Sequence, residues 1–190
     1  MKQSFLFSLV SLLGFGLLGC SSTPDAVAVS SSPTPVQSTP DAAPKKIDFY
    51  SKGKLVKSLS LDEMKKLSPA AEVTVTEPHM KEAKTYEAVA MAPVLDSVYG
   101  KKWRAAKDIE FTCLDGYKPI YSTSFYNKYN THLAFAEKGK STFEIVKPQE
   151  GNKVAPLAPF YVVWDYAKHP AAEKMGLSAW TYQLNAIDIK

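Results

Sequence analysis

A change of composition near residue 45 most constrains what this chain can fold into. Of the 25 residues in the range 21–45, 18 are Ser, Thr, Pro or Ala, and none is aromatic, Leu or Ile. Such a segment cannot bury enough apolar surface to offset its chain entropy. We therefore expect residues 21–45 to be a solvated tether. The folded part is then confined to residues 46–190, which are numerous enough for one sizeable core.

The N-terminus has the pattern of an export signal. Lys2 precedes an apolar run over residues 5–18, which is shorter than the ~20 residues that a membrane-spanning helix needs. The run therefore suits a secretory signal peptide. Its end, Leu17-Leu18-Gly19-Cys20, resembles a bacterial lipobox. The resemblance implies cleavage before Cys20 and a diacylglycerol thioether on its sulfur, whereas the alternative is a plain signal peptide with an incidental cysteine.

The expected organisation follows from this reading. Residues 1–19 are a lipoprotein signal peptide, and residues 20–45 are the lipidated cysteine with its tether. Several acyl chains on Cys20 would give stable attachment to a lipid bilayer. Ser21 follows Cys20, whereas an Asp there would resemble an inner-membrane retention signal. We expect the protein in the cell envelope, anchored to the outer membrane, and the sequence leaves the face of that membrane open.

Charge and metal-ligand composition limit the classes of partner. The formal net charge is +4 with 23 basic residues, yet Arg104 is the sole arginine. Arginine is the preferred residue for bidentate recognition of phosphates and bases, so we expect no nucleic-acid partner. The two cysteines, Cys20 and Cys113, are too few for a disulfide scaffold or a Cys-rich zinc site. The three histidines are scattered, and we expect no metal.

The first half of the domain has readable start and stop signals. Ser60 and Glu63 form a capping box at the start of a helix. Pro93 is compatible with the first turn of a second helix, and Gly100 with its end. In order, we expect a hairpin over 47–58 around Lys52-Gly53, a helix over 61–67, a strand over 72–76 and a helix from 92 to 100.

The second half predicts mainly strands. Asp115-Gly116 is the signal of a type I′ hairpin, and the continuous apolar run over 159–165 suits a strand that is buried on both faces. The apolar positions over 180–189 change phase, which indicates a bulge. We expect strands over 108–114, 117–122, 133–136, 159–165 and 180–189, with a helical turn over 124–130. The fold class is α+β, a strand-rich mixed β-sheet domain with a few short helices.

Four stretches in this order resemble a known family. They are Leu59-Ser60-Leu61, then 86–89 before the helix over 93–98, then 113–119, and finally 159–165 with 180–183. Together they are similar to small exported proteins that carry an oxidoreductase molybdopterin-binding-like domain, which has the sulfite-oxidase fold. The resemblance covers nearly all of residues 46–190 and implies a mixed α+β fold built around β-sheet structure.

The resemblance implies a redox centre that the residues do not match. Active members of that family ligate molybdenum through one cysteine thiolate, which precedes the segment resembling 86–98. Here residues 73–79 contain no cysteine, and Cys113 follows that segment, so it is not assigned as a ligand. We expect no cofactor, with molybdopterin suggested by the resemblance alone. The leading function is a non-catalytic binding or accessory module of the envelope that serves a redox partner protein. The alternatives are a periplasmic molybdopterin-dependent oxidoreductase with non-standard ligation and a structural or surface-interaction lipoprotein.

Five residues are candidates for a pocket. Glu77 and His79 flank Pro78 at a strand end, where they are either a carboxylate–imidazole pair or an exposed loop pair. Cys113 is either a reactive thiol or a small buried hydrophobe. Asp115 and Tyr117 either line a pocket beside their turn or serve the turn alone.

A set of aromatic residues near the middle of the domain also has two readings. Its spacing suits a ligand or partner platform, and it equally suits the buried face of a short helix. The set consists of Tyr121, Phe125, Tyr126 and Tyr129.

Overall fold

The computed structural model describes residues 45–78, 80–143, 146–148, 154–164, 169 and 177–190. Contacts divide the chain into Met1–Val36 and Gln37–Lys190, and every described residue belongs to the second unit. The predicted signal peptide, Cys20 and the tether up to residue 44 lie outside the described residues. Within the described part, no helix is both long and apolar enough to span a membrane.

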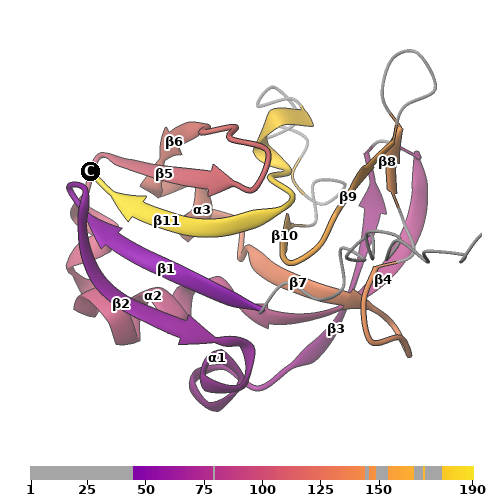
Figure 1. Cartoon of the computed structure of the whole chain (residues 1–190), viewed down its shortest axis with the longest axis horizontal. Helices are drawn as coiled ribbons and strands as arrows, with labels where there is room; N and C mark the ends of the chain where they lie inside the picture. Colours follow the sequence, from indigo (N-terminus) through magenta and orange to yellow (C-terminus); the bar gives the residue numbers. More distant parts are fainter. Residues whose placement is uncertain (1–44, 79, 144–145, 149–153, 165–168, 170–176) are drawn as a thin grey trace, which may run out of the picture. The chain divides into compact units, whose positions relative to one another are not determined.

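A mixed five-stranded sheet joins the two ends of the domain. Its order is β2-β1-β11-β5-β6, and Figure 1 shows β11, in yellow, between β1 and β5. β1 and β11 are parallel, and the other neighbours are antiparallel. The bounds are β1 Lys46–Ser51, β2 Lys54–Ser60, β5 Asp108–Cys113, β6 Ile120–Ser122 and β11 Leu184–Ile189.

A second sheet of four antiparallel strands completes the main framework. Its order is β10-β7-β4-β3. A separate small ladder pairs β8 with β9 (Figure 1). The bounds are β3 Ala71–Glu77, β4 Glu82–Ala90, β7 His132–Glu137, β8 Val146–Pro148, β9 Val154–Pro156 and β10 Tyr161–Val163. The predicted α+β, strand-rich class is confirmed.

Three short α-helices connect these strands. Both hydrogen bonds of the predicted capping box are present, because Ser60 Oγ accepts from the Glu63 N–H and the Ser60 N–H donates to the Glu63 carboxylate. The second helix ends at Gly100, whose φ of 64° favours glycine. The helices are α1 Leu61–Leu67, α2 Met91–Tyr99 and α3 Thr123–Lys128, with 3₁₀ segments η2 Gly100–Ala105 and η6 Leu177–Ala179.

The two predicted hairpins are present, but the second has a different turn. Lys52 and Gly53 have φ values of 50° and 78°, as the first hairpin requires. A type I′ turn at Asp115-Gly116 would need a positive φ at both residues. Gly116 has a positive φ but Asp115 does not, so the predicted turn type is wrong. Instead, the Gly116 N–H donates to the Cys113 carbonyl, and the Cys113 N–H donates to the Tyr117 carbonyl. A three-residue loop with glycine at the left-handed position results.

The last two predicted strands are shorter than expected. The apolar run over 159–165 yields only β10, all three residues of which are buried. The strand predicted over 180–189 begins at Leu184, because Gln183 has a φ of 54°, which ends extended pairing there. The predicted bulge is confirmed by a register shift between Leu184 and Ala186. Residues 177–183 are therefore not part of β11, and they lie beside the turn that follows β5.

The buried apolar side chains form one continuous cluster that includes residues of both sheets and of the helices. Phe125 and Tyr126 belong to it, with 7% and 1% of their surfaces exposed. Tyr126 makes edge-to-face contacts with the rings of Phe111 and Tyr121. This aromatic set is therefore largely core, which is the second of its two readings.

Candidate functional site

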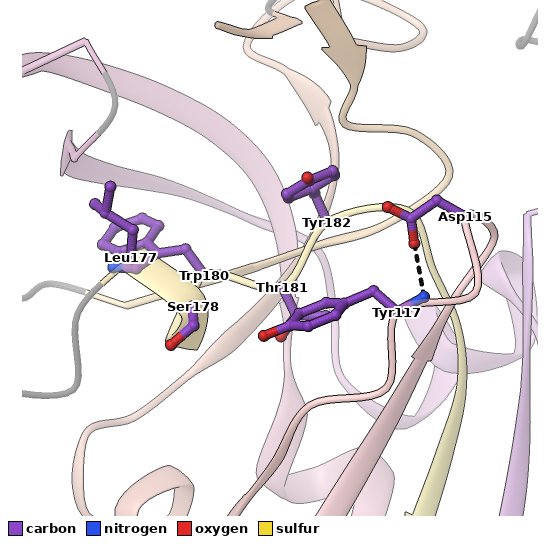
Figure 2. A pocket seen from close by; sticks show the side chains of 7 residues that line it. All are labelled: Asp115, Tyr117, Leu177, Ser178, Trp180, Thr181 and Tyr182. Atoms are coloured by element: carbon purple, nitrogen blue, oxygen red, sulfur yellow. Dashed lines mark hydrogen bonds between the residues drawn. The ribbon is translucent and has the colours of Figure 1, made fainter. Parts of the chain in front are cut away.

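A cavity of about 350 Å³ lies between the turn after β5 and the segment that leads into β11. Figure 2 shows its seven lining side chains, which come from these two segments and from η6 between them. Its size falls within the range of small-molecule sites. The lining residues are Asp115, Tyr117, Leu177, Ser178, Trp180, Thr181 and Tyr182.

Asp115 and Tyr117 reach the cavity because of the turn that they share. The Tyr117 N–H donates to Asp115 Oδ1 at 3.0 Å, a side-chain turn that orients the carboxylate. The Tyr117 side chain is 48% exposed. Figure 2 shows its ring extending from the turn toward Ser178 and Thr181. The structure thus brings these two candidates together in the wall of one cavity.

Hydroxyl groups gather at the inner side of the cavity. The Tyr121 hydroxyl lies close to the side chains of Ser178 and Tyr117, and burial raises its pKa to about 12. Thr181 is 2% exposed, and its Oγ1 is buried with no hydrogen-bond partner among the described residues. A buried hydroxyl without a partner carries a desolvation cost. A ligand that hydrogen-bonds to Thr181 would remove that cost.

The charge of the cavity is negative. Asp115 is the one charged side chain among its lining residues, and Asp115 Oδ2 has no hydrogen bond or ion pair to any described residue. The functional groups of the lining are therefore a carboxylate, hydroxyl groups and aromatic rings. Such a lining favours a cation or a neutral hydrogen-bond donor over an anion.

Cys113 lies beneath the turn and is not one of the residues that line this cavity. It is 3% exposed and pairs with Leu184 in the five-stranded sheet. Burial, and then the nearby charge of Asp115, raises the pKa of its thiol to about 12. A thiol with so high a pKa is protonated at neutral pH, and the thiolate is the form that binds metals and attacks electrophiles.

Glu77 departs from the exposed loop pair that the sequence suggested. It is 1% exposed, so the exposed-loop reading is wrong for this residue, and His79 lies outside the described residues. The Tyr161 hydroxyl donates to Glu77 Oε1 at 2.9 Å, and the Met80 N–H donates to Oε2 at 2.8 Å. Burial is tolerated because both carboxylate oxygens accept hydrogen bonds.

The Glu77–Tyr161 bond also shapes the second sheet. Glu77 ends β3 and Tyr161 begins β10, and these strands are opposite edges of that sheet. A bond across its full width requires the sheet to curve. The Tyr161 ring in turn lies 5.8 Å from the ring of Trp180, which lines the cavity. Glu77 thus supports a wall of the cavity through Tyr161 without lining it.

A second cavity, of about 390 Å³, brings His132 and His169 together beside the edge of β3. The ring of His169 lies 4.9 Å from that of Tyr129, and burial lowers the pKa of His132. Among the described residues, no group of three or more His, Cys, Asp or Glu is placed to hold a metal ion. The lining residues are Ala71, Glu72, Val73, Thr74, Tyr129, Asn130, His132 and His169.

Comparison with known proteins adds no relative. No protein family matches the chain, and no curated protein is significantly similar to it in sequence.

Sequence reasoning did not single out Ser178, Thr181 and Tyr182 as site residues. Their placement depends on where β11 begins, which the left-handed Gln183 decides. No signal in the sequence indicates this placement, because the alternation of Trp180, Thr181, Tyr182 and Gln183 is the pattern of a half-buried strand.

Proposed function

We propose that this protein is an envelope lipoprotein, acylated at Cys20 and anchored to the outer membrane. Its domain, residues 46–190, is a non-catalytic binding or accessory module with a sulfite-oxidase-like, molybdopterin-binding-like fold. The observation that carries the binding role is the cavity between the turn after β5 and residues 177–182. In its wall lies the buried hydroxyl of Thr181, which has no hydrogen-bond partner among the residues that the structure describes.

The surroundings of the cavity support a binding role over a purely structural one. Leu114, Tyr117, Ile120 and Leu177 are four of the six large hydrophobic side chains that the described surface exposes. Two of them line the cavity, and the other two lie within three residues of a lining residue along the chain. Exposed apolar side chains around a cavity are typical of a binding surface. An envelope redox protein is the class of partner that the family resemblance suggests.

The alternative of a molybdenum enzyme is not supported by the residues present. A molybdenum–thiolate bond needs an accessible, ionised cysteine, and Cys113 is the one cysteine of the folded domain. Its burial and its raised thiol pKa do not fit that role. The cofactor's phosphate would also need basic partners, and none of the described residues that line the cavity is a lysine or an arginine.

The sole arginine is committed elsewhere. The Arg104 guanidinium forms a two-point hydrogen-bonded ion pair with the carboxylate of Asp96, which also accepts from the Trp103 indole N–H at 2.7 Å. This fork geometry is the one that arginine would offer to a phosphate. Because Asp96 already occupies it, Arg104 supports the fold around η2. This observation is consistent with our expectation of no nucleic-acid partner.

Metal and pterin analysis of the full-length chain tests the non-catalytic assignment. The protein would be purified from a host that makes and exports the molybdenum cofactor, and molybdenum would be measured beside pterin fluorescence of the denatured protein. We expect neither above background, in wild type and in Cys113→Ser alike. Near-stoichiometric molybdenum would refute the proposal, and its loss in Cys113→Ser would identify that thiol as the ligand.

Fatty-acid labelling tests the anchor separately. Cells that express the full chain would be fed an alkyne-tagged palmitate, and the protein would be followed by membrane fractionation. We expect label on the wild type in the outer-membrane fraction and none on Cys20→Ser. Cys113→Ser is the matched control and should keep the label. An unlabelled wild-type protein would contradict lipidation while leaving the binding role of the domain to its own test.

A further inference from the structure

We propose that the cavity between the turn after β5 and residues 177–182 binds a small organic cation. The cation has an ammonium centre and, beside it, a hydroxyl or N–H group. This inference rests on the proposed binding function and names the chemical class of the ligand. It draws on three features of the lining: aromatic faces, a carboxylate, and a buried hydroxyl. Within the described part of the chain, the carboxylate has no counter-charge and the hydroxyl has no hydrogen-bond partner.

The aromatic residues supply the first feature. Tyr117, Trp180 and Tyr182 all line the cavity, and Figure 2 shows the rings of Tyr117 and Tyr182 in the region between Asp115 and Ser178. The face of an aromatic ring carries negative potential and attracts ammonium groups, especially quaternary ones, which shed water easily. The ring of Trp180 is held in place by Trp164, 5.5 Å away between centroids, so this wall is preorganised.

The carboxylate supplies the charge. Asp115 Oδ1 is occupied by the Tyr117 N–H, which leaves Oδ2 available. Within the described part of the chain Asp115 takes part in no ion pair, although eight other ion pairs are present there. A cation in the cavity would therefore meet an unneutralised carboxylate, whereas an anion would be repelled.

The hydroxyl groups supply the polar contact. Thr181 Oγ1 is buried in the cavity wall and has no hydrogen-bond partner among the described side chains and backbone groups, and it can both donate and accept a hydrogen bond. A ligand that offers a hydroxyl or an N–H beside its ammonium centre would satisfy Thr181 and the carboxylate together. Ligands of this kind occur both as free amino alcohols and as the headgroups of lipids.

Calorimetric titration of the full-length protein tests this proposal. The protein would be held in a polyoxyethylene detergent, which contains neither an ammonium group nor a sugar. The cationic probes each carry an ammonium group: choline and ethanolamine are free amino alcohols, and glycerophosphoethanolamine is a soluble lipid headgroup whose phosphodiester makes it a zwitterion. The neutral probes are 3,3-dimethylbutan-1-ol, which has the shape of choline without its charge, and glucose. We expect binding of at least one cationic probe, about tenfold or more tighter than that of either neutral probe.

Four variants assign binding to the cavity. Asp115→Asn keeps an oxygen for the Tyr117 N–H and removes the charge, so we expect it to weaken binding about tenfold. Thr181→Val keeps the side-chain shape and should weaken binding by about threefold or more. Tyr117→Ala should weaken binding, whereas Tyr117→Phe, which keeps the ring, should not. Asp62→Asn, on the exposed first turn of α1, makes the same charge change elsewhere and should bind as wild type does.

The possible outcomes separate this inference from the proposed function. If a neutral probe binds as tightly as the cations and Asp115→Asn has no effect, the cavity is a binding site but the cation assignment is wrong. If none of the probes binds, the cation assignment is also overturned. The non-catalytic assignment would then still be decided by the molybdenum and pterin analysis. A binding lipid headgroup with inert free amino alcohols would identify the ligand's source as lipid.

Discussion

The chemistry of Cys113 is decided by its surroundings. The same thiol that the sequence offers as a candidate nucleophile is buried beneath the turn after β5, next to the Asp115 charge. Both influences disfavour the thiolate. A cysteine in this position serves packing, and the polar groups that this region presents to the cavity are those of Asp115 and Tyr117 on the turn.

Alkylation of Cys113 tests this description. At about pH 8, iodoacetamide should modify Cys113 in the folded protein about 100-fold more slowly than in urea, because a pKa near 12 leaves far less thiolate than the ordinary value of 9.0. The rate is measured by mass spectrometry on the peptide that contains Cys113. Equal rates in both states would contradict a buried, protonated thiol.

The same raised pKa sets the direction of a pH effect on stability. The folded state holds the thiol proton more tightly than the unfolded state does. The contribution of this thiol to the free energy of unfolding is therefore constant below the unfolded pKa near 9. The free energy of unfolding falls as pH rises from there toward about 12. Cys113→Ala should remove that part of the alkaline decline.

At the scale of single elements, local signals govern the first half of the domain. The helix α1 depends on its capping box, in which Ser60 and Glu63 satisfy each other's backbone N–H groups. The Ser60 N–H and the Ser60 hydroxyl both donate to the Glu63 carboxylate, and these two hydrogen bonds hold its pKa below the ordinary value. The helix has only 7 residues, and Met64 is its single fully buried residue. Little tertiary packing therefore stabilises the helix, and its cap is expected to contribute to its stability.

Removing the cap is expected to destabilise the domain modestly. Ser60→Ala should lower the free energy of unfolding by about 1 kcal/mol, since the Glu63 N–H loses the Ser60 hydroxyl as its acceptor. Ser60→Asp, which can accept the same hydrogen bond, is the control and should retain most of the stability. Urea unfolding followed by circular dichroism measures both. No difference between Ala and Asp at this position would show that the cap is without effect.

At the scale of the whole molecule, β11 is the central strand of the five-stranded sheet and pairs the C-terminal end of the domain with its N-terminal strand β1. Ile187 pairs with Phe49 of β1 on one side and with Phe111 of β5 on the other. All three side chains are completely buried. The pairs β2-β1 and β5-β6 are therefore joined into one sheet only when β11 lies between them. Folding of this sheet thus depends on contacts between residues that are distant in sequence.

Truncation of Ile187 probes this closure. Ile187→Ala should lower the free energy of unfolding by about 2–5 kcal/mol, through lost burial and a cavity between three elements. Leu55→Ala, on the outer strand β2 where the side chain is 59% exposed, should change it by about 0.5 kcal/mol or less. Denaturant unfolding compares the two. Similar effects from both would contradict the central position of β11.

The sequence by itself determined the features that depend on neighbouring residues. The capping box, the Lys52-Gly53 hairpin, the end of α2 at Gly100 and the bulge in β11 were all predicted, because each is decided by interactions within a few residues. The α+β class followed from the number of such segments. The lipobox at Cys20 is a local signal of the same kind, and it stays a prediction.

Only the tertiary structure decided what lies next to what. It buried Glu77 against Tyr161 across a curved sheet, and it placed residues 177–182 beside Asp115 and Tyr117 to form the cavity. Local periodicity carries no information about which distant strands pair, and β1 with β11 is a parallel pairing between opposite ends of the domain. The turn residues of the candidate site were therefore readable in the sequence, whereas the wall that faces them became visible only once the chain had folded.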